Sequence, residues 1–206
     1  RRHVGTLMKR MGIEALYRRP NTSRKHAAHK IWPYLRDRKI DRANQVWALD
    51  TTYIPMARGF VYLTAVVDWA SRRVLAHRVA ITLESCHAVE AIEEAFTRYG
   101  TPEIVNTDQG SQFTATDFTD AVLERGIQLS MDGKGSWRDN VFVERLWRSV
   151  KYEEVYLKAY DSVSHACRSI ADCLTWYNQR RPHSSLADQT PDEAYFATLP
   201  AIKSAA

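Results

Sequence analysis

The sequence predicts an α/β fold in which a mixed five-stranded sheet is flanked by helices. Three apolar or β-branched segments between residues 46 and 79 have connections too short for a crossover, which predicts an antiparallel meander. Beyond residue 85, segments of helical periodicity alternate with two shorter apolar segments, the pattern of strands joined by helical crossovers. A basic segment with one amphipathic helix precedes this region.

Residues 1–43 are predicted to form a basic helical arm and linker. Apolar residues recur at helical spacing from Val4 to Met11, and Gly12 is expected to end this helix. Residues 1–45 contain 13 Lys and Arg against 3 Asp and Glu, whereas the rest of the chain contains 16 against 21. This division indicates that the arm contacts a polyanion while the core handles cations, with a solvated linker as the alternative.

The first predicted strand, residues 46–54, carries a carboxylate in its middle. Side chains alternate along a strand, so Trp47 and Leu49 share an apolar face while Asp50 lies on the other face among small residues. Aspartate is depleted in strands and is rarely buried without a partner. Hydrogen bonding to nearby backbone is the ordinary explanation of such a residue. Two further carboxylates in the sequence favour a catalytic role for Asp50 instead.

The remaining elements follow from apolar runs and breakers. Residues 60–67 are almost continuously apolar, as in a strand buried on both faces. Asp68 is expected to shape the turn after them rather than to bind a metal. The other predicted elements are a strand over 73–79, a helix over 85–99, a strand over 103–107, a helix over 115–125, a strand over 127–129, a loop over 131–139, a helix over 140–157, a helix with Asp161 as its N-cap, and a short helix over 192–196.

Asp108 is the second carboxylate of interest, because it directly follows the strand over 103–107. That strand comes after a helical crossover and can therefore lie parallel and next to the first strand. In an open α/β sheet, functional groups gather at such strand ends. The topology therefore predicts that Asp108 lies beside Asp50.

Glu144 is the third, in the first turns of the helix predicted over 140–157. Asn140, Arg148 and Lys151 are expected near the same helix face, because residues three and four apart are neighbours on a helix. A carboxylate followed by cations one and two turns later suits a metal beside a phosphate backbone. A row of surface ion pairs produces the same pattern.

Three motifs around these carboxylates resemble those of retroviral-integrase-type transposases. The motifs are Trp47–Tyr53, Asn106–Phe113 and Asp139–Glu153, and 35 residues separate Asp108 from Glu144, the spacing of the DD(35)E signature. The ending, Trp176–His183 followed by Thr190 and Pro191, is similar to the OrfB-type transposases of bacterial insertion sequences. The resemblance covers roughly residues 44–197. It departs from the family at residues 136–138, where smaller side chains are usual.

The resemblance implies a ribonuclease H-like core and a DDE transposase. Such an enzyme cleaves element ends in a divalent-metal-dependent reaction and transfers the 3′-hydroxyl into target DNA. Asp50, Asp108 and Glu144 would be its catalytic residues and would hold two Mg²⁺ ions, for which Mn²⁺ would substitute. Asp139 is a rival acidic ligand, and Glu144 is preferred for its spacing and its position on a helix.

The expected partner is DNA, both the element ends and the target duplex, with a homo-oligomer assembled on it. Residues 1–43 would end a DNA-binding region, 44–160 would form the catalytic core, and 161–206 would complete it with a helix and a polar tail. The expected DNA contacts are basic or amide side chains on the long helix, the glycine-containing loop, the arm and the tail: Lys151, Arg148, Asn140, Lys134, Arg24, Lys25, Arg180 and Arg181.

Composition limits the alternatives. The longest nearly apolar run, residues 60–67, is too short to span a bilayer, and three cysteines without a CxxC pair fit a reducing compartment, so we expect a cytoplasmic protein with no membrane contact. The resemblance further implies a bacterial, nucleoid-associated protein. The chain begins with Arg, which indicates a fragment of a longer protein. A ribonuclease H-like nuclease and a catalytically silent DNA-binding or assembly protein are the alternative functions.

Overall fold

The computed structural model describes residues 2–12, 35, 38–131 and 141–199. The chain divides into two compact units, Arg1–Ile31 and Trp32–Ala206. The described part of the first unit contains helix α1 (Arg2–Arg10), and Gly12 follows it at a φ of 68°. This confirms the predicted amphipathic helix and its end, because glycine adopts left-handed backbone without strain.

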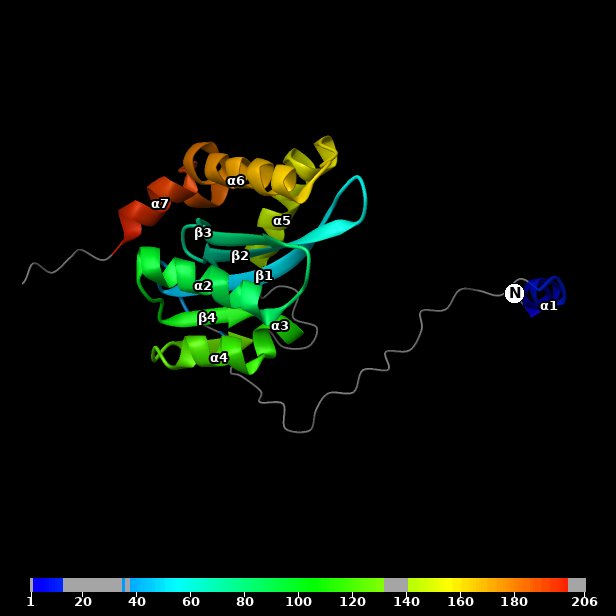
Figure 1. Ribbon diagram of the computed structural model, residues 1–206, viewed down its shortest axis with the longest axis horizontal. Coiled ribbons are helices and arrows are strands. Elements are labelled where there is room, and N and C mark those ends of the chain that lie inside the picture. Colours follow the sequence, from blue (N-terminus) through cyan, green and yellow to red (C-terminus); the bar gives the residue numbers. More distant parts are fainter. Residues whose placement is uncertain (1, 13–34, 36–37, 132–140, 200–206) are drawn as a thin grey trace, which may run out of the picture. The chain divides into compact units, whose positions relative to one another are not determined.

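The second unit is built on a mixed five-stranded sheet (Figure 1). Its strand order is β3-β2-β1-β4-β5, in which β1–β2 and β2–β3 are antiparallel and β4 and β5 are parallel to β1. The strands are β1 (Val46–Pro55), β2 (Phe60–Asp68), β3 (Val74–Ala80), β4 (Ile104–Thr107) and β5 (Gln128–Met131). The predicted meander and the predicted fourth strand, parallel and next to β1, are both confirmed.

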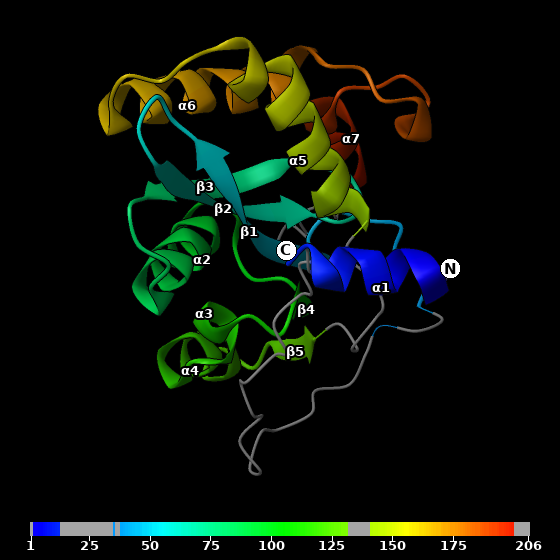
Figure 2. The same ribbon diagram turned by 90° about the vertical axis from the view of Figure 1, so that its right-hand side faces the viewer.

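Helices cover both faces of this sheet (Figures 1 and 2). The helices α2 (Ser85–Tyr99), α3 (Ser111–Thr114) and α4 (Thr116–Leu123) pack on one face. The helices α5 (Val141–Glu153) and α6 (Val163–Arg180) pack on the other. The last helix, α7 (Pro191–Thr198), adds Tyr195 to the first of these two layers.

Strand β1 is buried on both faces, which fixes its side-chain alternation. Trp47 and Leu49 belong to the layer under α2, and the Trp47 ring stacks on Phe96 with ring centroids 5.7 Å apart. Ala48 and Ile54 belong to the layer under α5 and α6. A one-residue slip of β1 would exchange these two sets of side chains, so packing holds the register that positions Asp50.

The helices after residue 140 differ in detail from the prediction. Helix α5 ends at Glu153, and a separate 3₁₀ turn covers Val155–Leu157. The helix breaks where Glu154 turns inward, because its buried carboxylate accepts hydrogen bonds from Tyr160 and Ser169. The predicted helix over 115–125 is shorter, as α4, and the short α3 precedes it.

The N-cap of α6 is Ser162, so the prediction of Asp161 was wrong. The Ser162 hydroxyl accepts from the His165 N–H at 3.2 Å, the bond that defines an N-cap side chain.

Within the described ranges, no helix is long and apolar enough to cross a membrane.

Asp68 organises the turn between β2 and β3, as predicted. Its side chain is fully buried, and its carboxylate accepts from the Asn44 N–H at 2.8 Å and from the Ser71 N–H and hydroxyl at 2.9 and 2.6 Å. Three donors from two segments therefore converge on one carboxylate and hold the end of β2 beside the start of β1.

Replacing this carboxylate is expected to destabilise the fold. Asp68→Ala leaves buried N–H donors without an acceptor, so the free energy of unfolding should fall by about 1–3 kcal/mol. Urea denaturation of the variant and of Asp172→Ala, which removes an exposed carboxylate on α6, provides the measurement. Equal midpoints for the two variants would contradict this role.

Candidate active site

Asp50 lies in the middle of the central strand on the face covered by α5. One carboxylate oxygen accepts from the indole N–H of Trp147 at 2.8 Å, and the other accepts from the Thr51 N–H at 2.7 Å. Trp147 is buried in α5, so this bond ties the strand to the helix. The local backbone bond is of the ordinary kind for a strand Asp, whereas the bond to Trp147 depends on tertiary packing.

Asp108 follows β4 directly and lies next to Asp50 in the sheet. Leu49 on β1 pairs with Thr107 on β4 in parallel register, and this is the last pair of the two strands. The residues that follow, Asp50 and Asp108, therefore lie side by side. Neighbouring strands lie about 4.8 Å apart. The Asp108 carboxylate accepts from the Gly110 N–H at 2.8 Å, and burial raises its pKa. The predicted proximity of these two carboxylates is thus present in the sheet.

Glu144 lies in the first turn of α5, one turn before Trp147 on the same helix. Its side chain is exposed and lines a pocket of about 400 Å³ together with Val141, Arg145 and Arg148. The Trp147 bond to Asp50 brings this end of α5 over β1. Glu144 therefore lies one turn along α5 from the residue that contacts Asp50, and its side chain is exposed to solvent.

The charges of Asp108 and Glu144 act on Asp50. The pKa of Asp50 is raised to about 7, mainly by burial and to a smaller extent by the negative charges of Asp108 and Glu144. The hydrogen bonds from Trp147 and Thr51 lower it. A buried carboxylate with like charges nearby favours any cation that reaches it.

The arrangement was tested for its fit to a divalent metal. As the side chains stand, no three His, Cys, Asp or Glu in the described ranges are close enough together to hold an ion. Asp50 and Asp108 direct oxygens at Trp147, Thr51 and Gly110 instead. The donor set itself, carboxylate oxygens opposed by one another's charge, matches what Mg²⁺ prefers. The chemistry of these donors thus fits a divalent cation, whereas the three side chains as they stand do not converge on one point.

Gly110 leaves room for the Asp108 carboxylate. A Cβ at this position would lie 2.8 Å from Asp108 Oδ1 and 2.6 Å from Gln112 Nε2, distances that real Cβ atoms do not show. The Gly110 backbone has a φ of −62°, which suits other residues, so only space opposes a side chain here.

Gly110→Ala is therefore expected to slow any reaction that uses the Asp108 carboxylate about tenfold or more, with little loss of stability, because it displaces Asp108 rather than the core. Single-turnover reaction rates and thermal melting, compared with Gly5→Ala, provide the measurement; nothing lies within 4 Å of a Cβ at Gly5, which has helical backbone in α1. Wild-type rates for Gly110→Ala would contradict the placement of Asp108 in the site.

The predicted DNA contacts fall into three groups. Arg148 is exposed and lines the Glu144 pocket, whereas Lys151 is partly buried in the last turn of α5. Arg181 donates to Glu153 at 3.1 Å, and Arg180 is exposed at the end of α6. The other predicted DNA contacts lie outside the described residues: Asn140, Lys134, Arg24 and Lys25. The rival ligand Asp139 lies outside them as well.

Sequence reasoning did not assign the role of Trp147. Its signal was its position three residues after Glu144, which places the two on neighbouring parts of one helix face. Which strand residue that face meets depends on packing between α5 and β1. Arg72 and Arg145, described below, were missed for the same reason.

The mixed five-stranded sheet flanked by helices is the fold of integrase catalytic core domains. The HTLV-2 integrase catalytic core domain, solved in complex with magnesium in a trimeric form, superposes with a TM-score of 0.58 at 19% identity. The alignment covers 77% of this chain and 99% of that one. At this identity the likeness concerns the fold, and it confirms the fold class that the sequence predicted.

Two family models, both described as integrase core domain, match residues 40–136 and 125–191. A putative transposase for insertion sequence element IS986/IS6110 from Mycobacterium tuberculosis (strain H37Rv) is 34% identical over 165 residues, 75% of this chain and 59% of that protein. The transposase for insertion sequence element IS904 from Lactococcus lactis is 29% identical over 204 residues, 93% of this chain and 79% of that protein. The chain belongs to the integrase core domain family, and it spans about three fifths of the mycobacterial relatives.

Proposed function

We propose that this chain is the catalytic part of a DDE transposase that cuts the ends of an insertion sequence and joins their 3′-hydroxyls to target DNA. The observation that supports the proposal is that Asp108, directly after β4, follows the residue paired with Leu49 and so lies next to Asp50 in the middle of β1, while α5, which carries Glu144, contacts Asp50 through Trp147. Family membership supports the class of reaction.

Asp50, Asp108 and Glu144 would hold two Mg²⁺ ions. Such ions supply an activated water or 3′-hydroxyl and stabilise the departing oxygen of the phosphodiester. The chain keeps the first two carboxylates in place through the Trp147 and Gly110 N–H groups. No covalent bond between protein and DNA is needed. The protein therefore contributes mainly position and charge.

DNA is the proposed substrate on both sides of the reaction. Arg148, exposed beside Glu144, and Lys151, two turns after it on α5, are proposed to contact phosphates next to the scissile bond. Because transposition joins two ends, we propose that two or more chains assemble on the DNA. Mn²⁺ is proposed to replace Mg²⁺, since both take oxygen ligands.

A strand-transfer assay on a duplex carrying the ends of the element that encodes this chain tests the proposal, with Glu144→Gln as control. Joined products that need Mg²⁺ or Mn²⁺ and vanish in the control are expected. Cleavage without joining would instead identify a ribonuclease H-like nuclease. Absence of both, with DNA still bound, would identify a silent binding or assembly protein.

Lys151→Ala is expected to weaken DNA binding for every sequence and to lower the slope of log K against log salt concentration by about one, since one phosphate contact is lost. Fluorescence anisotropy at several salt concentrations measures both. Arg98→Ala, which removes an exposed charge from α2 on the opposite face of the sheet, is the control. A salt slope equal to that of the Arg98→Ala control would show that Lys151 does not contact a DNA phosphate.

A further inference from the structure

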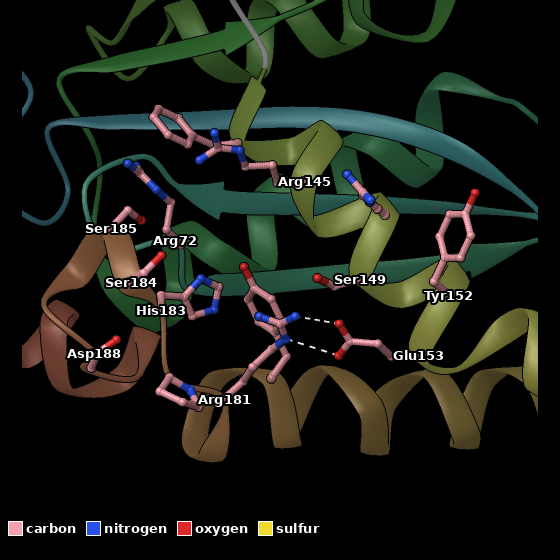
Figure 3. Close-up of a pocket in the computed structure, with 14 residues that line it drawn as sticks. Arg72, Arg145, Ser149, Tyr152, Glu153, Arg181, His183, Ser184, Ser185 and Asp188 are labelled. Atoms are coloured by element: carbon pink, nitrogen blue, oxygen red, sulfur yellow. Dashed lines mark hydrogen bonds and ion pairs between the residues drawn. The ribbon is translucent and has the colours of Figure 1, made fainter.

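A basic pocket of about 630 Å³ lies apart from the catalytic carboxylates, between α5, the end of α6 and the chain that follows it (Figure 3). We call it the arginine pocket. Four arginines from three segments line it together with a histidine: Arg72, Arg145, Arg148, Arg181 and His183. The segments are far apart in sequence, so only the folded chain creates this concentration of charge.

Two carboxylates line the same pocket, and one is already engaged. Glu153 accepts from Arg181 through both of its oxygens, which lowers the pKa of Glu153 (Figure 3). That pair is neutral as a unit. Among the described lining residues, Asp188 is then the remaining acid opposite Arg72, Arg145 and Arg148. The pocket therefore keeps a net positive charge.

Two buried nitrogen atoms at the pocket lack a hydrogen-bond partner among the described residues, Arg72 Nη1 and His183 Nε2. The Arg72 guanidinium lies over the Phe142 ring, 3.2 Å from its centroid, and the His183 ring packs against Tyr177 at 5.0 Å. Packing thus holds both side chains in place while leaving these atoms unsatisfied. Buried polar atoms normally have hydrogen-bond partners. Two buried nitrogen atoms without partners in a cationic pocket therefore point to a ligand that accepts hydrogen bonds.

Arg72 and Arg145 also oppose each other. Burial is the main cause that lowers the pKa of Arg72 to about 10, and the charge of Arg145 contributes (Figure 3). The Arg72 guanidinium remains cationic near neutral pH. An anion between such groups relieves their repulsion and uses the planar donors that suit a phosphate.

The arginine pocket is continuous with the candidate active site. Arg145 and Arg148 line it and also line the smaller pocket that contains Glu144. A chain of phosphates that passes Glu144 along α5 therefore meets the arginine pocket next. This connection selects a backbone phosphate of DNA over an unrelated small anion.

We propose that the arginine pocket binds a phosphate group of the DNA backbone, outside the phosphodiester that is cut. Arg72, Arg145 and His183 donate hydrogen bonds to this phosphate. The Arg181–Glu153 ion pair lines the same pocket and holds the two side chains in place. The inference rests on the proposed function, because it assigns a second contact with the same DNA. It adds Arg72, Arg145 and His183 to the predicted contacts Arg148 and Arg181, which also line this pocket.

DNA affinity of the whole chain tests the proposal. Arg145 is exposed, so Arg145→Gln keeps the fold, and Arg168→Gln removes one exposed charge from α6 as a matched control. For Arg145→Gln we expect about tenfold weaker binding to duplex DNA and a salt slope smaller by about one. Arg72→Lys, which keeps the charge but not the planar donors, should also weaken binding; melting curves show whether it folds.

The source of the phosphate is distinguished by a second arm. Melting temperatures are recorded in inorganic phosphate and in sodium chloride at equal ionic strength. A phosphate-dependent rise that Arg145→Gln abolishes, without any change in DNA affinity, would overturn the DNA assignment and leave a site for free phosphate. Equal DNA affinities and salt slopes for Arg145→Gln and Arg168→Gln, with no phosphate effect, would overturn the pocket altogether. Both readouts measure binding, so a chain that binds DNA without cutting it would refute the proposed function but not this site.

Discussion

Asp50→Asn is expected to lower the rate of DNA cleavage roughly a thousandfold or more. The amide is nearly the same size as the carboxylate but lacks the negative charge that would hold a divalent cation. Charge stabilisation by a metal contributes several kcal/mol to such reactions, and each 1.36 kcal/mol is a factor of ten in rate. Single-turnover cleavage in Mg²⁺ is the measurement.

The same variant separates chemistry from binding. Asp50 lies in the middle of β1 and does not line the arginine pocket, so DNA affinity and thermal stability should stay close to those of the wild type. Asp172→Asn, an exposed position on α6, controls for the substitution itself. An Asp50→Asn protein that still cleaves in Mg²⁺ would remove Asp50 from the catalytic residues.

Trp147→Phe is expected to lower cleavage about 10- to 100-fold, the usual effect of removing a group that orients a metal ligand. Phenylalanine retains most of the buried apolar contact of Trp147 but cannot donate to Asp50 Oδ2, a bond of 2.8 Å. The Mg²⁺ concentration that gives half-maximal rate should rise, because Asp50 is no longer held.

This dependence on Mg²⁺ distinguishes a positioning role from a purely structural one. A loss of packing alone would lower the melting temperature without moving the half-saturating Mg²⁺ concentration. Trp176→Phe, at a half-exposed tryptophan on α6, should change neither quantity. A Trp147→Phe protein with unchanged rate and unchanged Mg²⁺ dependence would show that its bond to Asp50 has no part in the reaction.

Much of the fold could be predicted because its signals are local. The apolar run that became β2 and the pattern that became α2, closed by Gly100 at a φ of 77°, gave boundaries within about a residue. The predicted helix boundaries were wrong where tertiary contacts decide at which residue a helix begins or ends. Asp161 and Ser162 are both good N-caps, and only the fold shows which side chain faces His165. The end of α5 depends on Glu154 meeting Ser169.

The candidate site divides in the same way. The proximity of Asp50 and Asp108 follows from topology, since a parallel crossover places two strand ends together. The bond from Trp147 to Asp50 joins positions 97 residues apart and depends on how α5 packs. The arginine pocket joins Arg72 to His183, from the β2–β3 turn and the chain after α6, and local sequence patterns do not report such pairs.

Direct measurement of bound metal tests the central claim that Asp50, Asp108 and Glu144 hold divalent cations together. Electron paramagnetic resonance of Mn²⁺ titrated into the protein–DNA complex counts the ions bound to each chain. We expect two ions for the wild type and loss of tight binding in each of Asp50→Asn, Asp108→Asn and Glu144→Gln, with DNA still bound. Unchanged Mn²⁺ binding in all three variants would contradict the account.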